Sequence, residues 1–134
     1  MFKALQADSI TLYLINEENL ADVHSLLLTT DDPTTPQKLA QARKIFEGLQ
    51  HGTIDRSLFT DNANSYFSEL ALKDFSSSLA PLGTPQGFVQ VYQGLRGGMT
   101  LRVYLVRFAQ KTLRVWTYEM PDGKLEQYQV AEQG

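Results

Sequence analysis

The fold is decided by residues 88–130, which read FVQVYQGLRGGMTLRVYLVRFAQKTLRVWTYEMPDGKLEQYQV. Four segments rich in β-branched and aromatic residues predict strands at residues 88–95, 99–108, 112–119 and 124–130. The segments between them are short and contain Gly-Gly, Gln-Lys or Pro-Asp-Gly, which are typical of hairpin turns. Short connections make consecutive strands antiparallel neighbours, so we expect a four-stranded antiparallel sheet in chain order.

Charge pairing indicates a register for the two middle strands. A two-residue loop at residues 110–111 would place Arg102 opposite Glu119, a favourable cross-strand pair. The same register would place Arg107 opposite Arg114, which is unfavourable unless both side chains reach solvent.

Both faces of this sheet are predicted to be apolar. One face is expected to carry Leu101, Val103, Leu105, Trp116, Tyr118, Tyr128 and Val130. The other is expected to carry Arg102, Tyr104, Val106, Phe108, Leu113, Val115, Glu119, Leu125 and Gln127. Helices can cover only one face, so the other needs a partner, another domain or a shallow pocket.

Residues 36–82 are predicted to form helices that precede the sheet. Apolar residues recur at helical spacing from Leu39 to Leu49, and we expect Thr35 to cap this helix with Pro36 at its first position. Shorter helices are expected at residues 55–59, from Thr60 or Asp61 to Phe67, and from Ser68 to about Leu79. The fold class is therefore α+β, with N-terminal helices packed on a bent four-stranded antiparallel sheet.

The N-terminal residues read as a separate segment. Residues 10–15 predict a strand and residues 20–28 a short helix, whereas residues 29–36 contain only Thr, Asp and Pro and predict a linker. We expect residues 1–32 to be a weakly integrated strand–helix segment, or the tail of a preceding domain. The main domain is expected to span residues 36–134.

The composition excludes several classes of function. The chain has 134 residues and a net charge of −3, so it lacks the basic excess of a nucleic-acid-binding protein. Its sequence contains no apolar run near the roughly 20 residues that a membrane span needs, so no membrane partner is expected. It contains no cysteine, which excludes disulfides, thiolate nucleophiles and cysteine-based metal sites. The first eight residues lack the apolar core of a signal peptide, which favours the cytoplasm.

Several short motifs resemble a known α+β family. They are residues 52–55 (GTID), which follow a helix, residues 58–60 (LFT), Tyr66-Phe67, and residues 123–128 (GKLEQY), which look like the last strand of that family. Together they cover about residues 36–131 and resemble the nuclear transport factor 2-like (SnoaL-like, cystatin-like α+β) superfamily. In that fold, helices cradle against a strongly bent sheet to form a cone. Some enzymes of the family use an Asp or a His at its mouth as a base.

The N-terminal segment shows a different resemblance. Residues 9–16 (SITLYLIN), followed by a helix, are similar to the closing strand and helix of serine β-lactamase-like hydrolase domains, which in bacteria often precede a small α+β domain. The Ser-x-x-Lys motif of those hydrolases is absent from this chain. The resemblance implies the tail of a larger enzyme, periplasmic if that enzyme is exported, or a stand-alone relative.

Seven residues are candidates for lining a ligand pocket. They are Asp55, Tyr66, Arg102, Tyr104, Trp116, Glu119 and Gln127. Other interpretations exist for several of them. Asp55 precedes a turn and can cap it, Arg102 and Glu119 can form a cross-strand ion pair, and Trp116 can pack in a core or an interface.

No residue is assigned a catalytic or metal-binding role. His24 and His51 are the only histidines, and neither has a second ligand at metal-binding spacing, so we expect no metal and no cofactor. The predicted function is a non-catalytic small-ligand-binding or protein-docking module, with a homodimer through the sheet or a hydrolase domain in cis as partner. The alternatives are a small isomerase or dehydratase that uses Asp55 or His51 as base, or an accessory domain of a serine hydrolase.

Overall fold

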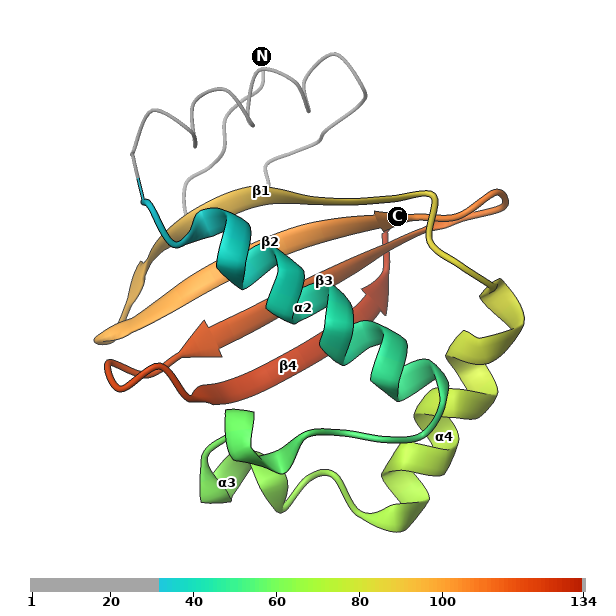
Figure 1. The fold of residues 1–134 in the computed structure, drawn as a ribbon, viewed down its shortest axis with the longest axis horizontal. Coiled ribbons are helices and arrows are strands. Elements are labelled where there is room, and N and C mark those ends of the chain that lie inside the picture. The colour runs from blue at the N-terminus through green and yellow to red at the C-terminus, as the bar shows by residue number, and fades with distance from the viewer. Residues whose placement is uncertain (1–31, 134) are drawn as a thin grey trace.

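The computed structural model describes residues 32–133, which form an α+β fold with helices packed on an open four-stranded antiparallel sheet (Figure 1). The strands are β1 (Gly87–Arg96), β2 (Met99–Arg107), β3 (Thr112–Glu119) and β4 (Leu125–Glu132), and they lie side by side in chain order. The predicted strands and their order are therefore confirmed. The predicted strand and helix of the N-terminal segment lie outside the described residues.

The register between β2 and β3 differs from the predicted one by two residues. Arg102 lies opposite Thr117, and Glu119 lies opposite Thr100. The two-residue turn lies one position earlier than expected, at residues 109–110, because the Phe108 N–H donates to the carbonyl of Lys111 (2.8 Å) and continues the pairing up to those two residues. A shift of two residues leaves every side chain on its predicted face, because side chains alternate with a period of two.

The prediction for the faces of β4 is confirmed for Leu125, which packs in the main core with Tyr104, but was wrong for Gln127, Tyr128 and Val130. A β-bulge between Tyr118 and Glu119 shifts the pairing of β3 with β4, so that Tyr128 lies opposite Thr117 and Gln127 lies opposite Tyr118. An extra residue in one strand exchanges the faces of all residues beyond it. Tyr128 therefore faces the helices, together with Val130.

The helices begin at polar caps. The main helices are α2 (Thr35–Gln50), α3 (Asp61–Asn64) and α4 (Glu69–Leu79), with 3₁₀ turns η1 (Arg56–Leu58) and η2 (Ala80–Leu82). Thr60 caps α3 and Ser68 caps α4, close to where the sequence predicted these helices to begin. Their hydroxyl oxygens accept hydrogen bonds from the backbone N–H groups of Ala63 and Ala71. The expected cap of α2 was wrong: Thr34 is the N-cap, and its N–H and hydroxyl donate to Asp32 instead of closing the first turn.

Helix α2 lies across one face of the sheet, where the main core forms, whereas α3 lies beside β4 and α4 lies beyond the sheet (Figure 1). Phe46 and Leu49 of α2 are fully buried. The ring of Phe46 lies 6.0 Å from the rings of Phe88 and of Phe108 on the sheet. Gln50 ties α2 to the end of α4, because its Nε2 donates to the carbonyl of Leu79 (3.0 Å).

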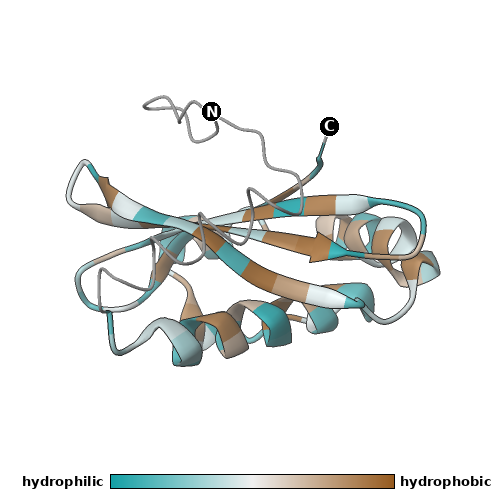
Figure 2. Ribbon diagram, turned by 90° about the horizontal axis from the view of Figure 1, so that it is seen from above, coloured by the Kyte–Doolittle hydropathy of each residue, from teal (hydrophilic) through white to brown (hydrophobic). Residues whose placement is uncertain are grey.

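A second apolar cluster lies on the opposite face, which we call the outer face. Within residues 32–133 no helix covers it, as Figure 2 shows. The buried members of the cluster are Val91, Leu101 and Val103, and the partly buried ones are Val89, Tyr92, Leu105, Trp116 and Tyr118. Both faces are thus apolar, as the sequence indicated, and homodimerisation through the outer face stays a prediction.

Candidate functional site

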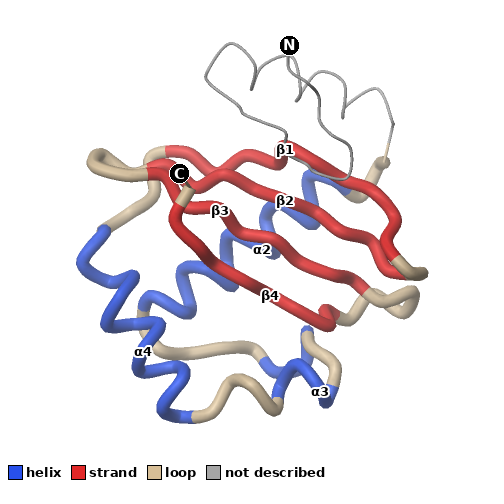
Figure 3. Tube along the Cα trace, turned by 180° about the vertical axis from the view of Figure 1, so that it is seen from behind, coloured by secondary structure: helices blue, strands red, loops and turns tan. Residues whose placement is uncertain are grey.

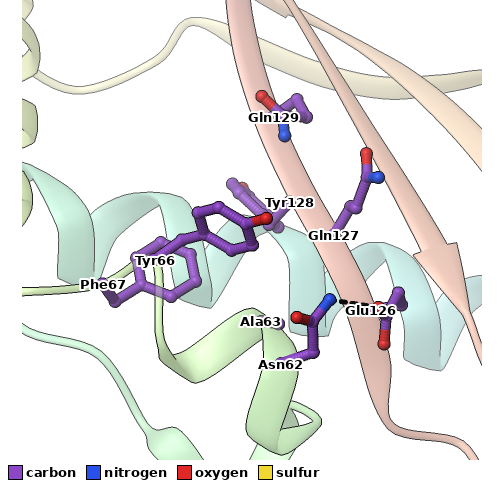
Figure 4. A pocket seen from close by; sticks show the side chains of 8 residues that line it. All are labelled: Asn62, Ala63, Tyr66, Phe67, Glu126, Gln127, Tyr128 and Gln129. Carbon is purple, nitrogen blue, oxygen red and sulfur yellow. Dashed lines mark hydrogen bonds between the residues drawn. The ribbon is translucent and has the colours of Figure 1, made fainter.

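A pocket of about 230 Å³ lies between α3, the turn that follows it, and β4 (Figure 4). Figure 3 shows that β4 is an outermost strand of the sheet and that α3 lies near its start. The lining residues are Asn62, Ala63, Tyr66, Phe67, Glu126, Gln127, Tyr128 and Gln129. The pocket thus combines aromatic rings with amide groups and one carboxylate, and we call it the edge pocket.

Buried aromatic side chains fix one side of the edge pocket. The hydroxyl of Tyr128 donates to the carbonyl of Ala42 in α2 (2.8 Å), and the Phe67 ring packs edge-on against Phe59 with centroids 5.1 Å apart. In contrast, 71% of Tyr66 is exposed. The pocket therefore has a rigid base and an accessible aromatic rim.

Arg56 holds the turn that carries this rim. Its guanidinium donates to the backbone carbonyls of Asn64 (3.1 Å) and Phe67 (2.6 Å). The Asn64 side chain returns a hydrogen bond to the carbonyl of Arg56 (3.0 Å). These bonds anchor the backbone on both sides of Tyr66, so its position is set before any ligand arrives.

The polar groups of the edge pocket are of two kinds. Glu126 already accepts hydrogen bonds at both carboxylate oxygens, from the Thr60 hydroxyl (2.8 Å) and the Asn62 amide (2.5 Å). The side-chain amides of Gln127 and Gln129 have no hydrogen bond to any residue that the structure describes. Both residues alternate with the inward-facing Tyr128, so their amides lie on the outer-face side of β4, at the rim of the pocket, and could bind a ligand there without breaking an existing contact.

The other predicted residues lie in different places. Tyr66 and Gln127 line the edge pocket, whereas Arg102 and Glu119 form a buried ion cluster close to Tyr104. Asp55 lines a shallow groove of about 430 Å³ along α2. The structure thus distributes the seven candidates over separate locations.

The ion cluster joins the start of α2 to the sheet. Arg102, of which 4% is exposed, pairs with Glu119 and with Asp32, whose Oδ2 lies 3.2 Å from a guanidinium nitrogen. Lys38 of α2 contacts the other oxygen of Glu119 (2.7 Å), and Gln93 donates to Asp32 (2.6 Å). The predicted ion pair between Arg102 and Glu119 is present, although the two residues lie diagonally across the strands.

The carboxylates of this cluster are held in their ionised form. Hydrogen bonds from the side chain and backbone of Thr34, with further ones from Gln93 and Arg102, hold the pKa of Asp32 well below its usual range. Burial alone would raise the pKa of Glu119, but hydrogen bonds and charges of Lys38 and Arg102 outweigh it and lower that pKa. Burial raises the pKa of the neighbouring Tyr104 hydroxyl, which stays protonated. Two positive and two negative charges balance here, so the cluster has no excess charge to attract an ion.

Acidification is expected to weaken the fold through this cluster. A carboxyl group with a lowered pKa in the folded state stabilises the protein above its ordinary pKa, here 3.8 for Asp32 and 4.5 for Glu119, and loses that effect as the pH falls through its folded pKa. Denaturant unfolding between about pH 7 and pH 3 should show the decline, and Glu119→Gln should remove part of it. An unchanged pH dependence in this variant would contradict the assignment.

Gln90 joins the cluster, because its Nε2 donates to the Gln93 side chain (3.2 Å). Two buried polar atoms here have no partner in the described chain: Nε of Arg102 and Oε1 of Gln90. Buried groups of this kind usually bind an ordered water. The remaining nitrogens of Arg102 are occupied by carboxylates, so the cluster fits a structural role better than a ligand site.

The remaining candidates have local explanations. Asp55 caps η1 by accepting from the Ser57 N–H (3.0 Å) and hydroxyl, which lowers the pKa of the carboxyl group, as the capping interpretation predicted. Trp116 lies on the outer face, where the Arg114 guanidinium stacks 5.1 Å from its ring centre. His51 follows α2 and contacts the carbonyl of Glu47 through Nδ1 (2.9 Å).

Sequence reasoning missed several residues of these sites. Gln129 could have been predicted, because it lies two residues from Gln127 and therefore on the same face of a strand. The contacts of Asp32 and Lys38 with the ion cluster could not, since both residues are distant in sequence from Arg102. Glu126 was missed because its partners, on α3, reach it only in the folded chain.

Comparison with known proteins finds no match to a family model, a curated protein or a solved structure. Within residues 32–133, no three His, Asp or Glu side chains gather in a way that could hold a metal ion. The same part of the chain has no helix that is both long and apolar enough for a membrane span.

Proposed function

We propose that the protein is a non-catalytic binding module whose ligand occupies the edge pocket. The observation that carries this proposal is the combination of a highly exposed Tyr66 with two unengaged amides, Gln127 and Gln129, around a rigid aromatic base. Large exposed aromatic rings beside polar groups are typical of binding sites, because the ring offers apolar area and the amides give direction.

The chemistry of the lining residues indicates what kind of ligand would fit the edge pocket. Amides both donate and accept hydrogen bonds, so they suit a polar molecule that carries both kinds of group. A volume of about 230 Å³ is small beside the roughly 300–1,000 Å³ of pockets for drug-sized ligands. We therefore expect a small, polar, uncharged molecule or a small part of a larger one, with an apolar side that packs on Tyr66.

A binding role is favoured over catalysis by the state of the acidic and basic groups. General acid–base chemistry needs a titratable group within hydrogen-bond reach of the substrate. Glu126, the titratable carboxylate of the edge pocket, is occupied at both oxygens, and neither Asp55 nor His51 lines this pocket.

Tyr66→Ala and Gln127→Ala are each expected to weaken ligand binding at least tenfold, because they remove the stacking surface and one hydrogen-bonding amide. A screen of small polar metabolites by thermal shift would identify ligands, and amide NMR signals of Gln127 and Gln129 would report binding. Leu70→Ala is the matched control, since 70% of Leu70 is exposed and it does not line the pocket. Ligands that bind equally well to all three variants, or no ligand at all, would overturn the proposal.

A further inference from the structure

The outer face of the sheet is apolar across three strands and carries only basic charges. Its apolar cluster combines side chains of β1, β2 and β3 and contains no residue of β4. Alternation along the described strands places Arg96, Arg107 and Arg114 on this face and no carboxylate, since Glu126 bonds to the start of α3 instead. An apolar sheet face needs a cover, and this one fits a cover that is both apolar and acidic.

The chain enters the described fold close to this face. Figure 3 shows β1 as an outermost strand of the sheet. Asp32, the first described residue, accepts hydrogen bonds from Gln93 of β1 (2.6 Å) and from Arg102 of β2 (3.2 Å). Residues 29–31 can extend from there over at most about 10 Å. This length is enough to pass the edge of β1, so the residues before position 29 can reach the outer face.

Residues 20–28 have the composition that such a cover requires. A helix over this range would be about 13 Å long, enough to cross from β1 to β3, whose axes lie about 10 Å apart. Its apolar residues share one helical face, and they are Leu20, Val23, Leu26 and Leu27. Residues 16–31 contain four carboxylates and no Lys or Arg, so the segment also complements the arginines of the outer face.

We propose that residues 20–28 form a helix that packs on the outer face and covers its apolar cluster. The sheet would then lie between two helices, with α2 on the opposite face. The N-terminal segment would be part of the domain, in contrast to the weakly integrated segment that the linker composition predicted. Because the cluster stops at β3, the cover leaves Gln127 and Gln129 accessible, and the inference is independent of the proposed function.

A second copy of the chain is the competing occupant of the outer face, and two arguments disfavour it. The described strands of a second copy would bring the same three arginines and no carboxylate to the interface. Residues 20–28 are joined to the fold by a short linker, and such tethering gives an effective concentration on the order of millimolar. A second copy at micromolar concentration competes poorly with a tethered segment, so we expect no dimer through this face.

Trp116 provides a direct test, because it is the only tryptophan of the chain and belongs to the outer-face cluster. The test compares the full chain with Leu27→Glu and with the control Ser25→Glu, which adds the same charge on the opposite face of the predicted helix. Leu27→Glu should increase acrylamide quenching of Trp116 roughly threefold and shift its emission to longer wavelength, because the cover opens. Ser25→Glu should leave both properties as in the wild type.

A spin label provides a second measurement that decides the question if Leu27→Glu does not fold. The chain contains no cysteine, so Asp22→Cys can carry a single nitroxide label. The label should broaden the amide NMR signals of Leu101 and Val103 more strongly than those of α4. Substitution at Asp22 keeps the apolar face of the predicted helix intact.

Three results would overturn the proposal. Equal quenching of Trp116 in Leu27→Glu and Ser25→Glu would show that residues 20–28 do not cover it, as would a label that broadens no outer-face signal. Strong quenching in the wild type would show that the outer face is open. Light scattering that gives a dimer, with Trp116 exposed on dilution, would assign the face to a second copy.

Discussion

Phe46→Ala is expected to lower the free energy of unfolding by about 3–5 kcal/mol, a large share of the roughly 5–15 kcal/mol typical of a domain. Phe46 is fully buried in the main core, and its ring lies beside those of Phe88 in β1 and of Phe108 directly after β2. Removing the ring leaves a cavity between α2 and the sheet that neither rigid element can fill. Denaturant unfolding followed by circular dichroism would measure the loss.

A matched control separates this effect from a general loss of apolar surface. Leu70→Ala also shortens an apolar side chain, but 70% of Leu70 is exposed, so the expected change is within about 0.5 kcal/mol. Similar effects of the two substitutions would mean that α2 does not pack on the sheet as described.

Arg102→Met is expected to destabilise the protein by about 3–5 kcal/mol, because it leaves the buried carboxylate of Glu119 and that of Asp32 without their shared cation. Met keeps much of the side-chain volume, so the loss reports the charge rather than a cavity. The double variant Arg102→Met/Glu119→Gln should recover part of the stability, since the negative charge of Asp32 is then balanced by the positive charge of Lys38. Thermal and denaturant unfolding at neutral pH would measure all three proteins.

The same experiment distinguishes the two interpretations of Arg102. A structural ion pair predicts a large loss of stability and no direct effect on ligands of the edge pocket. A ligand-binding arginine predicts nearly unchanged stability with weaker binding. If the free energy of unfolding of Arg102→Met equals that of the wild type, Arg102 is a candidate ligand-binding residue and its ion pair is not needed for stability.

Local chemistry explains why much of the secondary structure could be predicted. The strands follow from β-prone segments between short turns, and the caps at Asp55, Thr60 and Ser68 follow from polar side chains that reach backbone groups only a few residues away. Alternation along β2 placed Arg102 and Tyr104 on one face without knowledge of the partner strand. These features depend on neighbours in the chain, which the sequence shows directly.

The site could be predicted only in part. Tyr66 and Gln127 were named as pocket residues, but nothing in the sequence indicated that they share a pocket with Asn62 and Gln129. Arg102 was expected to pair with Glu119, whereas its contact with Asp32 spans 70 positions in the chain. Contacts at such separation are set by how the helices lie on the sheet, which no local pattern encodes.

The sequence by itself determined the class of the fold, the order of the four strands and the apolar character of both faces of the sheet. Only the tertiary structure decided which face of β4 meets the helices, because one bulged residue beside Tyr118 reverses every position beyond it. It also decided that Phe59 forms a bridge with Leu125 of β4 directly before Thr60 caps α3. Both outcomes depend on backbone hydrogen bonds between distant segments, and the pattern of side chains along the sequence hardly predicts such bonds.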